Sequence, residues 1–156
     1  MLEIFNENTL LKVKNSDNKV IVVDTVNKKV SIDDFGIDYP GEYEKSWILS
    51  EVFEYEQKLF YAIHNEQKLI MVIFDEVNEI KEELLEFFGD VDVLLVAWTK
   101  NMQKLIENIE TRVVIPFGEG KDVLLNTLWQ HKEEISSFKL KQEMWEENTE
   151  YVNLAL

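Results

Sequence analysis

The feature that most constrains the fold is a change of period in the hydrophobic pattern. The first half of the chain consists of short segments rich in β-branched and aromatic residues, separated by turn-forming residues. We expect these segments to form strands at 9–14, 19–24, 29–32, 47–53, 58–64 and 68–74. The first three predict an antiparallel meander, with turns at 15–18 and 27. The sequence Asn-Glu-Gln at 65–67 predicts a hairpin between the last two.

The period becomes helical after residue 75. Apolar residues recur at helical spacing at Val77, Ile80, Leu84, Leu85 and Phe88, and we expect Gly89 to cap that helix at its carboxyl end. Later segments predict strands at 91–97, 112–116, 137–141 and 151–154, and helices at 101–108 and 121–132. Hairpins followed by β-α-β-α units predict an α/β (α+β layered) domain in which helices cover sheets.

Length and composition set the organisation that we expect. The chain has 156 residues, of which 46% are hydrophobic and 12% aromatic, and this predicts a single domain over residues 1–156. The absence of cysteine excludes disulfides and thiolate zinc sites. No signal peptide is visible, and the longest apolar runs, at 69–74 and 91–98, are far shorter than the roughly 20 residues that span a bilayer. We therefore expect a cytoplasmic protein without a membrane partner.

The charge limits the kind of partner. Sixteen basic against 31 acidic residues give a formal charge of −15, which repels phosphates of nucleic acids and anionic membranes. The sequence therefore predicts no direct binding of DNA or RNA. Acidic residues are dense at 79–86 and 143–150. They are interpreted as solvated surfaces, as a docking face for a basic partner, or as a surface that imitates nucleic acid.

Five segments, in order, resemble those of a known family. Residues 38–44 (DYPGEYE) are similar to a "PGEYE" turn, 61–75 to a strand ending in "HxGD", and 89–96 to "GDVDVLLV". Residues 113–116 are similar to the start of "IVIPMH", and 141–152 to a closing strand. The chain thus resembles the metallo-β-lactamase-fold hydrolases, in particular the small branch of L-ascorbate-6-phosphate lactonases. The resemblance implies a truncated αββα sandwich.

The resemblance fails at the metal site. The family holds zinc or manganese with imidazoles and carboxylates, normally including an HxHxDH cluster, and residues 25–36 contain no histidine. The resemblance places two ligand histidines at Val72 and Gly118, neither of which has a donor side chain. Only Asp75, at the position of the bridging aspartate, is retained, and one carboxylate binds a divalent cation weakly. The resemblance therefore implies that no metal or other cofactor is bound.

Other catalytic arrangements have little support in the sequence. Both histidines, His64 and His131, would need to fold close to Asp75 to build a relocated metal site. Carboxylate pairs such as Asp75-Glu76 have no fixed separation, which glycoside chemistry requires. The serines lack a nucleophile-elbow motif.

Two aromatic residues follow strands on the side where the family has its active site. These are Trp98 and Phe117. We expect them to fill the former cavity, to line a dry pocket or to form a contact surface for a partner.

The sequence thus predicts a pseudoenzyme, which is not an enzyme and acts by binding another protein or by self-association. One alternative is a metal-dependent hydrolase with a relocated site, which metal content would reveal. The other is an acidic nucleic-acid mimic, whose binding to a basic protein would collapse with added salt.

Overall fold

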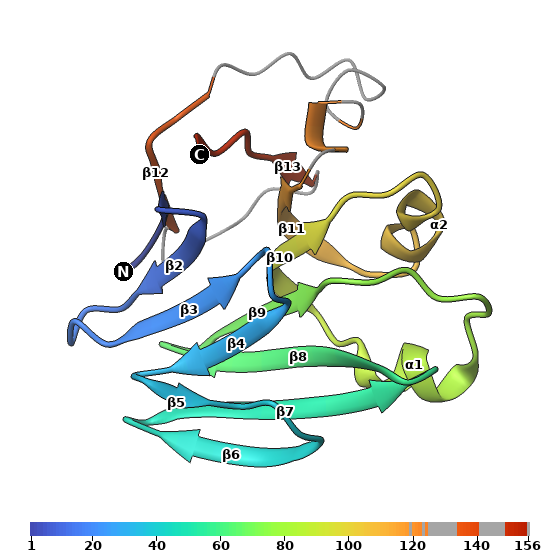
Figure 1. Ribbon diagram of the computed structural model, residues 1–156, viewed down its shortest axis with the longest axis horizontal. Helices are drawn as coiled ribbons and strands as arrows, with labels where there is room; N and C mark the ends of the chain where they lie inside the picture. The colour runs from blue at the N-terminus through green and yellow to red at the C-terminus, as the bar shows by residue number, and fades with distance from the viewer. Residues whose placement is uncertain (119, 123, 125–133, 141–148, 156) are drawn as a thin grey trace.

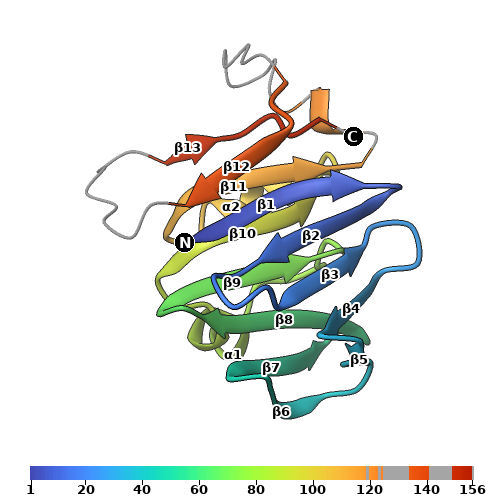
Figure 2. The same cartoon turned by 90° about the vertical axis from the view of Figure 1, so that its left-hand side faces the viewer.

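The protein folds into two β-sheets stacked face to face, with helices against the outer side of one sheet (Figure 1, Figure 2). The computed structural model describes residues 1–118, 120–122, 124, 134–140 and 149–155. One apolar cluster lies between the two sheets, and a second lies between the larger sheet and the helices. Among the described residues, no helix is long and apolar enough to cross a membrane.

The smaller sheet is an antiparallel meander with one added strand. Its order is β12-β1-β2-β3-β4-β5. The strands are β1 (Leu2–Glu7), β2 (Leu10–Lys14), β3 (Val20–Asp24), β4 (Lys29–Ile32), β5 (Phe35–Gly36) and β12 (Ser137–Leu140). Burial alternates along β2 and β3, as expected for a sheet with one face on the core. The predicted meander is therefore confirmed.

The larger sheet joins antiparallel hairpins to parallel strands. Its order is β13-β11-β10-β9-β8-β7-β6. The strands are β6 (Gly41–Lys45), β7 (Ile48–Tyr55), β8 (Lys58–Asn65), β9 (Lys68–Ile73), β10 (Val91–Ala97), β11 (Thr111–Phe117) and β13 (Glu150–Tyr151). The strands β9, β10, β11 and β13 pair in parallel. The mostly apolar sequences of β9, β10 and β11 fit a position between the core and the helices.

The helices α1 (Glu82–Phe87) and α2 (Met102–Ile106) are shorter than the sequence pattern predicts. Val77 and Ile80 precede α1, yet they pack against the helix-side cluster. Gly89 does not cap α1. The cap is Phe88, in an extended conformation with φ −65° and ψ 135°, so the chain leaves the helix without a left-handed residue.

The strand predictions were largely correct, with three strands missed and one shifted. The predicted strands at 9–14, 19–24, 29–32, 47–53, 58–64, 68–74, 91–97, 112–116 and 137–141 are confirmed within one or two residues. Strands β1, β5 and β6 were not predicted, and the last strand is β13 rather than 151–154. Most of the predicted helix 121–132, including His131, lies outside the described residues, as does most of the tail segment 141–152.

Candidate functional site

The carboxyl ends of three parallel strands define the candidate site. Asp75 and Glu76 follow β9, Trp98 and Thr99 follow β10, and Gly118 follows β11. Because parallel strands end at the same edge of a sheet, these residues lie along one edge, as in other α/β sites. The structure thus places Asp75 and Gly118, two of the predicted positions, at the carboxyl ends of parallel strands.

Asp75 forms an ion pair with a lysine from the opposite sheet. Lys28, in the turn between β3 and β4, places its Nζ 2.5 Å from Asp75 Oδ1. The side chains are 55% and 30% exposed, so solvent screens the pair and we expect it to contribute at most about 1 kcal/mol to stability. The ammonium group is therefore the cation at the carboxylate that the resemblance assigned to metal binding.

The other two predicted positions do not fit metal ligands. Val72 is fully buried and pairs with Tyr61 on one side and Leu95 on the other, with its side chain in the cluster between the sheets. Gly118 has open space around it, but its φ of +89° disfavours any residue with a side chain. Within the described part of the chain, no three His, Asp or Glu residues are grouped so that they could hold a metal ion. The residues present therefore do not fit the family's metal.

An aromatic series fills the sandwich behind the strand ends. The ring of Phe74 makes edge contacts with Tyr61, at a centroid distance of 5.8 Å, and with Phe117, at 5.9 Å. Burial raises the pKa of Tyr61 to about 12, and the charges of Asp38 and Asp75 add to this effect. The phenol therefore stays neutral at physiological pH, and this part of the site is apolar.

Trp98 and Phe117 do not form a shared contact surface. Trp98 is 9% exposed and belongs to the helix-side cluster, whereas Phe117 is 3% exposed and lies between the two sheets. The rings are therefore buried on opposite faces of the larger sheet. A methyl group on Gly120 would lie 2.5 Å from the carbonyl oxygen of Trp98, which shows how closely the chain packs there. Because both side chains are buried, the structure supports the expectation that they fill space. It does not support the expectation that they form an exposed contact surface.

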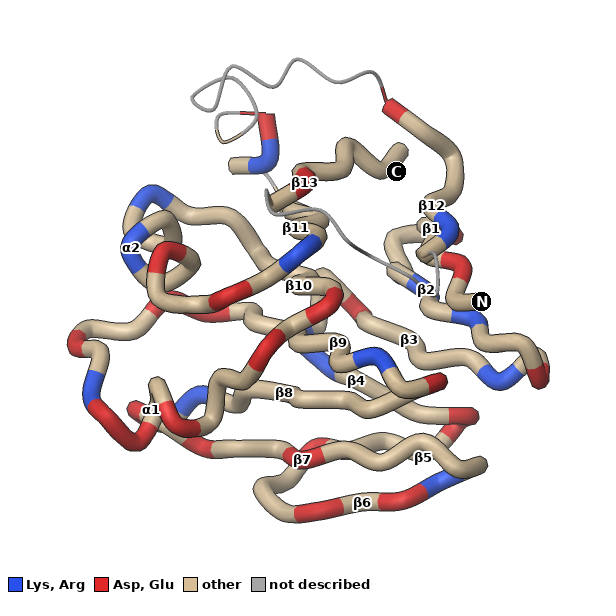
Figure 3. The backbone as a smooth tube through the Cα atoms, turned by 180° about the vertical axis from the view of Figure 1, so that it is seen from behind, with Lys and Arg blue, Asp and Glu red and all other residues tan. Residues whose placement is uncertain are grey.

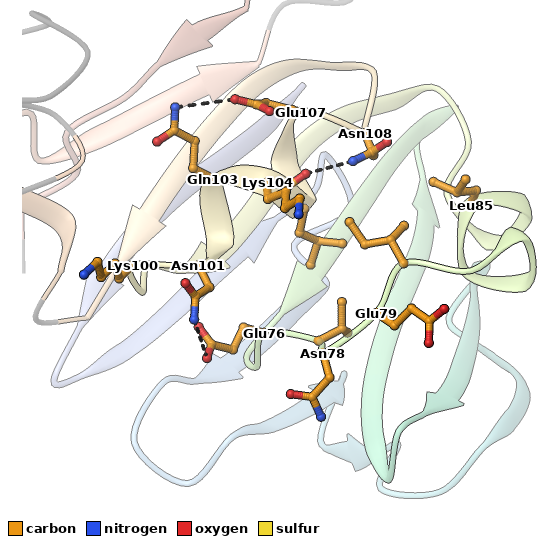
Figure 4. Close-up of a pocket in the computed structure, with 13 residues that line it drawn as sticks. Glu76, Asn78, Glu79, Leu85, Lys100, Asn101, Gln103, Lys104, Glu107 and Asn108 are labelled. Atoms are coloured by element: carbon orange, nitrogen blue, oxygen red, sulfur yellow. Dashed lines mark hydrogen bonds between the residues drawn. The ribbon is translucent and has the colours of Figure 1, made fainter.

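A polar hollow lies on the helix side of the same edge (Figure 4). It has a volume of about 790 Å³, and its lining includes Glu76, Lys104 and several side-chain amides. Glu76 accepts hydrogen bonds from Thr99 Oγ1 at 2.6 Å and from Asn101 Nδ2 at 3.2 Å. These hydrogen bonds lower the pKa of Glu76 because they stabilise its charged form. Asp75 and Glu76 thus have partners from different layers and do not form an acid/base pair.

The hydrogen bond from Thr99 gives a first prediction. In Thr99→Val, the pKa of Glu76 is expected to rise towards that of a free glutamate, because the largest contribution to its lowered pKa is lost. The stability that this hydrogen bond supplies is present above the ordinary pKa of about 4.3 and is lost as the pH falls through the lower folded pKa. Carboxyl NMR titration measures the change. Thr25→Val is the control, because it removes an exposed hydroxyl that donates to the backbone carbonyl oxygen of Thr9 and not to Glu76. An unchanged Glu76 pKa would contradict the assignment.

The proposed relocation of the metal site is not supported by the position of His64. His64 is exposed and pairs with Leu69 at the start of β9, whereas Ile73 at the end of β9 pairs with Phe60. The four residue steps from Leu69 to Ile73 span about 13 Å, and Asp75 lies further on. His64 therefore lies level with the start of β9 and Asp75 lies beyond its end, so the two side chains cannot bind the same ion.

Sequence reasoning missed Lys28 and the hollow beside Glu76. Lys28 adopts a left-handed conformation, with φ 56°, in a turn 47 residues from its partner. Nothing local in the sequence indicates a pair across two sheets. The hollow combines residues 76–80 with the α2 region, and its amides at 78, 101, 103 and 108 are the only sequence signal that could have suggested it.

Comparison with solved structures identifies the fold. The chain superposes with a TM-score of 0.71 on a Thermotoga maritima protein, assigned to the metallo-β-lactamase superfamily with a suggested zinc-dependent hydrolase activity. The sequences are 17% identical, and the match covers 97% of this chain and 98% of that one. The architecture is thus a metallo-β-lactamase-like fold with few helices, which confirms the predicted fold class. The helices α1 and α2 lie against the larger sheet, and Leu124, from the helical residues at 121, 122 and 124, packs in the same helix-side cluster.

The sequence comparisons add no narrower assignment. No protein-family model matches the chain, and neither does any curated protein. At 17% identity the structural likeness concerns the fold alone. The resemblance to the lactonase branch therefore stays a prediction.

Proposed function

We propose that this protein is a non-catalytic metallo-β-lactamase-like protein that acts by binding another protein. The observation that carries the proposal is the Lys28–Asp75 ion pair. An ammonium group at this carboxylate repels a divalent cation and satisfies the charge that would attract one. The buried Val72 and the left-handed Gly118 support the same conclusion, because the positions implied for imidazoles offer no donor.

Exposed apolar residues support a role in protein binding. Two large exposed side chains, Trp47 at 91% and Leu49 at 55%, lie at the turn end of the β6–β7 hairpin, which is opposite to the carboxyl ends of the parallel strands. Tyr39, at 75%, precedes β6 on the side of those carboxyl ends. Aromatic residues of this kind commonly supply the binding energy of protein interfaces. The surface that we expect to be used is therefore separate from the former active site.

A metal-binding measurement tests the non-catalytic part of the proposal. We expect elemental mass spectrometry of untagged protein to find no stoichiometric metal, and zinc or manganese to leave the melting temperature unchanged. Stoichiometric binding that is lost in Asp75→Asn would contradict the proposal and favour a metal-dependent hydrolase.

The ion pair gives a second prediction. Lys28→Ala is expected to change the free energy of unfolding by less than about 1 kcal/mol, because the pair is exposed to solvent. The same variant is expected to bind manganese more tightly than the wild type, since Asp75 loses its competing cation. Lys29→Ala, at the exposed neighbouring position, is the control. Calorimetric titration and urea denaturation measure the two quantities, and equal manganese affinity in both variants would argue against competition by Lys28.

The alternative of a hydrolase is favoured by one observation, the hollow beside Glu76. Its volume would accommodate a small polar molecule, and the carboxylate of Glu76 lies at its rim (Figure 4). Turnover of a lactone or phosphoester substrate by the wild type that disappears in Glu76→Gln would establish this alternative.

A further inference from the structure

The strand β6 is an open edge of the larger sheet. Within the described residues it pairs with β7 alone, and Lys45 opposite Ile48 closes the hairpin around Ser46 and Trp47. In a two-residue hairpin the closing pair is hydrogen-bonded, and hydrogen-bonded and non-hydrogen-bonded pairs then alternate. The backbone N–H and C=O groups of Glu42 and Glu44 therefore point away from β7, where another strand could pair with them.

Trp47 stands at the end of this edge in a conformation that tryptophan does not favour. Its φ is +65°, and such positions in tight hairpins are usually occupied by glycine or asparagine. Glu44 Oε1 accepts a hydrogen bond from the Trp47 backbone N–H at 3.1 Å, which fixes the turn. With 91% of the residue exposed, the indole gains little from burial in this fold. Neither turn preference nor core packing therefore accounts for a tryptophan at this position.

Most charges along the edge are negative. Glu42 lies directly opposite Glu51 across β6 and β7, and like charges in such a pair destabilise a sheet. Glu44 follows on the same side of β6, opposite the half-exposed Leu49. Figure 3 shows the acidic positions along β6, with one basic residue, Lys45, at its end. The edge thus combines three carboxylates with two exposed apolar side chains.

We propose that the edge of β6 binds a basic, extended segment of a partner protein, which adds a strand to the larger sheet and packs an apolar side chain on Trp47. The partner's backbone pairs with Glu42 and Glu44, and lysine or arginine at alternate positions faces the carboxylates. This inference rests on the proposed protein-binding function and names the chemistry of the partner.

A second copy of the chain does not fit this edge. An antiparallel pairing of two β6 strands centred on Tyr43 would place Glu42 of each copy opposite Glu44 of the other, with like charges directly paired. The formal charge of −15 on each chain adds to the repulsion. A basic strand removes both penalties, so the charges favour a different protein over self-association.

A synthetic peptide tests the inference directly. The probe is a capped nine-residue peptide of alternating lysine and valine, and its acidic counterpart replaces lysine with glutamate. We expect amide NMR shifts at residues 42–49 with the basic peptide alone, and binding that weakens as salt is added. Trp47→Ala is expected to weaken binding at least tenfold, the effect of a hot-spot aromatic, whereas Leu85→Ala, at an exposed leucine on α1, leaves it unchanged.

Two changes at one residue separate backbone pairing from charge. Glu42→Gln removes the carboxylate and keeps the N–H, whereas Glu42→Pro also removes the outward N–H, which an edge strand tolerates. We expect the proline variant to bind more weakly than the glutamine variant, with circular dichroism confirming that both are folded. If proline prevents folding, the Trp47→Ala result decides.

Three outcomes would overturn the inference. They are absence of binding at millimolar basic peptide, equal binding of the acidic peptide, and a wild-type dimer in sedimentation that Trp47→Ala dissociates. None of these outcomes would contradict the non-catalytic assignment, because that assignment depends on the metal and turnover measurements. Conversely, stoichiometric metal binding with intact peptide binding would overturn that assignment alone.

Discussion

Replacing Phe117 with alanine is expected to lower the free energy of unfolding by about 3–5 kcal/mol, the range for truncating a buried phenylalanine. Phe117 is 3% exposed and packs on Phe74 between the two sheets. The truncation leaves a cavity at the end of the sandwich, where backbone from three parallel strands limits collapse. At roughly 3 °C per kcal/mol for a protein of this size, the melting temperature should fall by about 10 °C or more.

Phe35→Ala is the matched control for this prediction. Phe35 is 48% exposed, although its ring also contacts another aromatic, Tyr43, at a centroid distance of 6.2 Å. We expect a loss of about 1 kcal/mol or less, because about half of Phe35 is already exposed to water. Urea denaturation of both variants measures the difference. Equal losses would show that Phe117 does not fill the site as the structure indicates.

Introducing histidine at Val72 is expected to destabilise the protein by about 2–5 kcal/mol at pH 8, although the resemblance implies histidine at this position. Val72 is fully buried among apolar side chains, so the larger imidazole is overpacked and its polar atoms lose contact with water. Burial also depresses the pKa of an introduced imidazole. The unfolded state therefore binds more protons, and the deficit relative to wild type should grow as the pH falls below about 6.5.

Val26→His, at a position 69% exposed, is the control for this substitution. We expect a change within about 0.5 kcal/mol there, since an exposed imidazole is solvated in both states. Thermal melting across pH, with and without zinc, checks both variants. Zinc that restores the stability of Val72→His would contradict our assignment, because it would show that the surrounding residues still form a metal site.

The sequence predicted most strands because alternation of apolar and polar residues is local. The strand β10 was clear from another local signal, a short continuous apolar run, and it is buried on both faces. The strand β6 was not predicted, because Gly41 and the three charged residues among its five have low β propensity. Its pairing with β7 holds it in the sheet. The predicted helix start failed for a related reason, since Val77 and Ile80 are buried by packing without being helical.

The candidate site was predicted in part. Chain order placed Asp75 and Gly118 after their strands, and the missing donors at Val72 and Gly118 could be stated from residue identity alone. The burial of Trp98 and Phe117 could not be predicted from the sequence, because each residue follows its strand in the same way. Only the packed sheet places their rings on opposite faces. An expected contact surface thus became two buried side chains.

The sequence by itself determined the layered α/β class, the strong negative charge and the loss of donor side chains at the ligand positions that the resemblance implies, since these follow from residue identity and local periodicity. Only the tertiary structure decided that Lys28 pairs with Asp75, that Glu76 borders a hollow, and that Glu42 of β6 lies opposite Glu51 of β7 on the edge that ends at Trp47. Such contacts depend on strand register and on how the sheets stack, and these are set by burial summed over the whole chain, so no short segment of sequence records them.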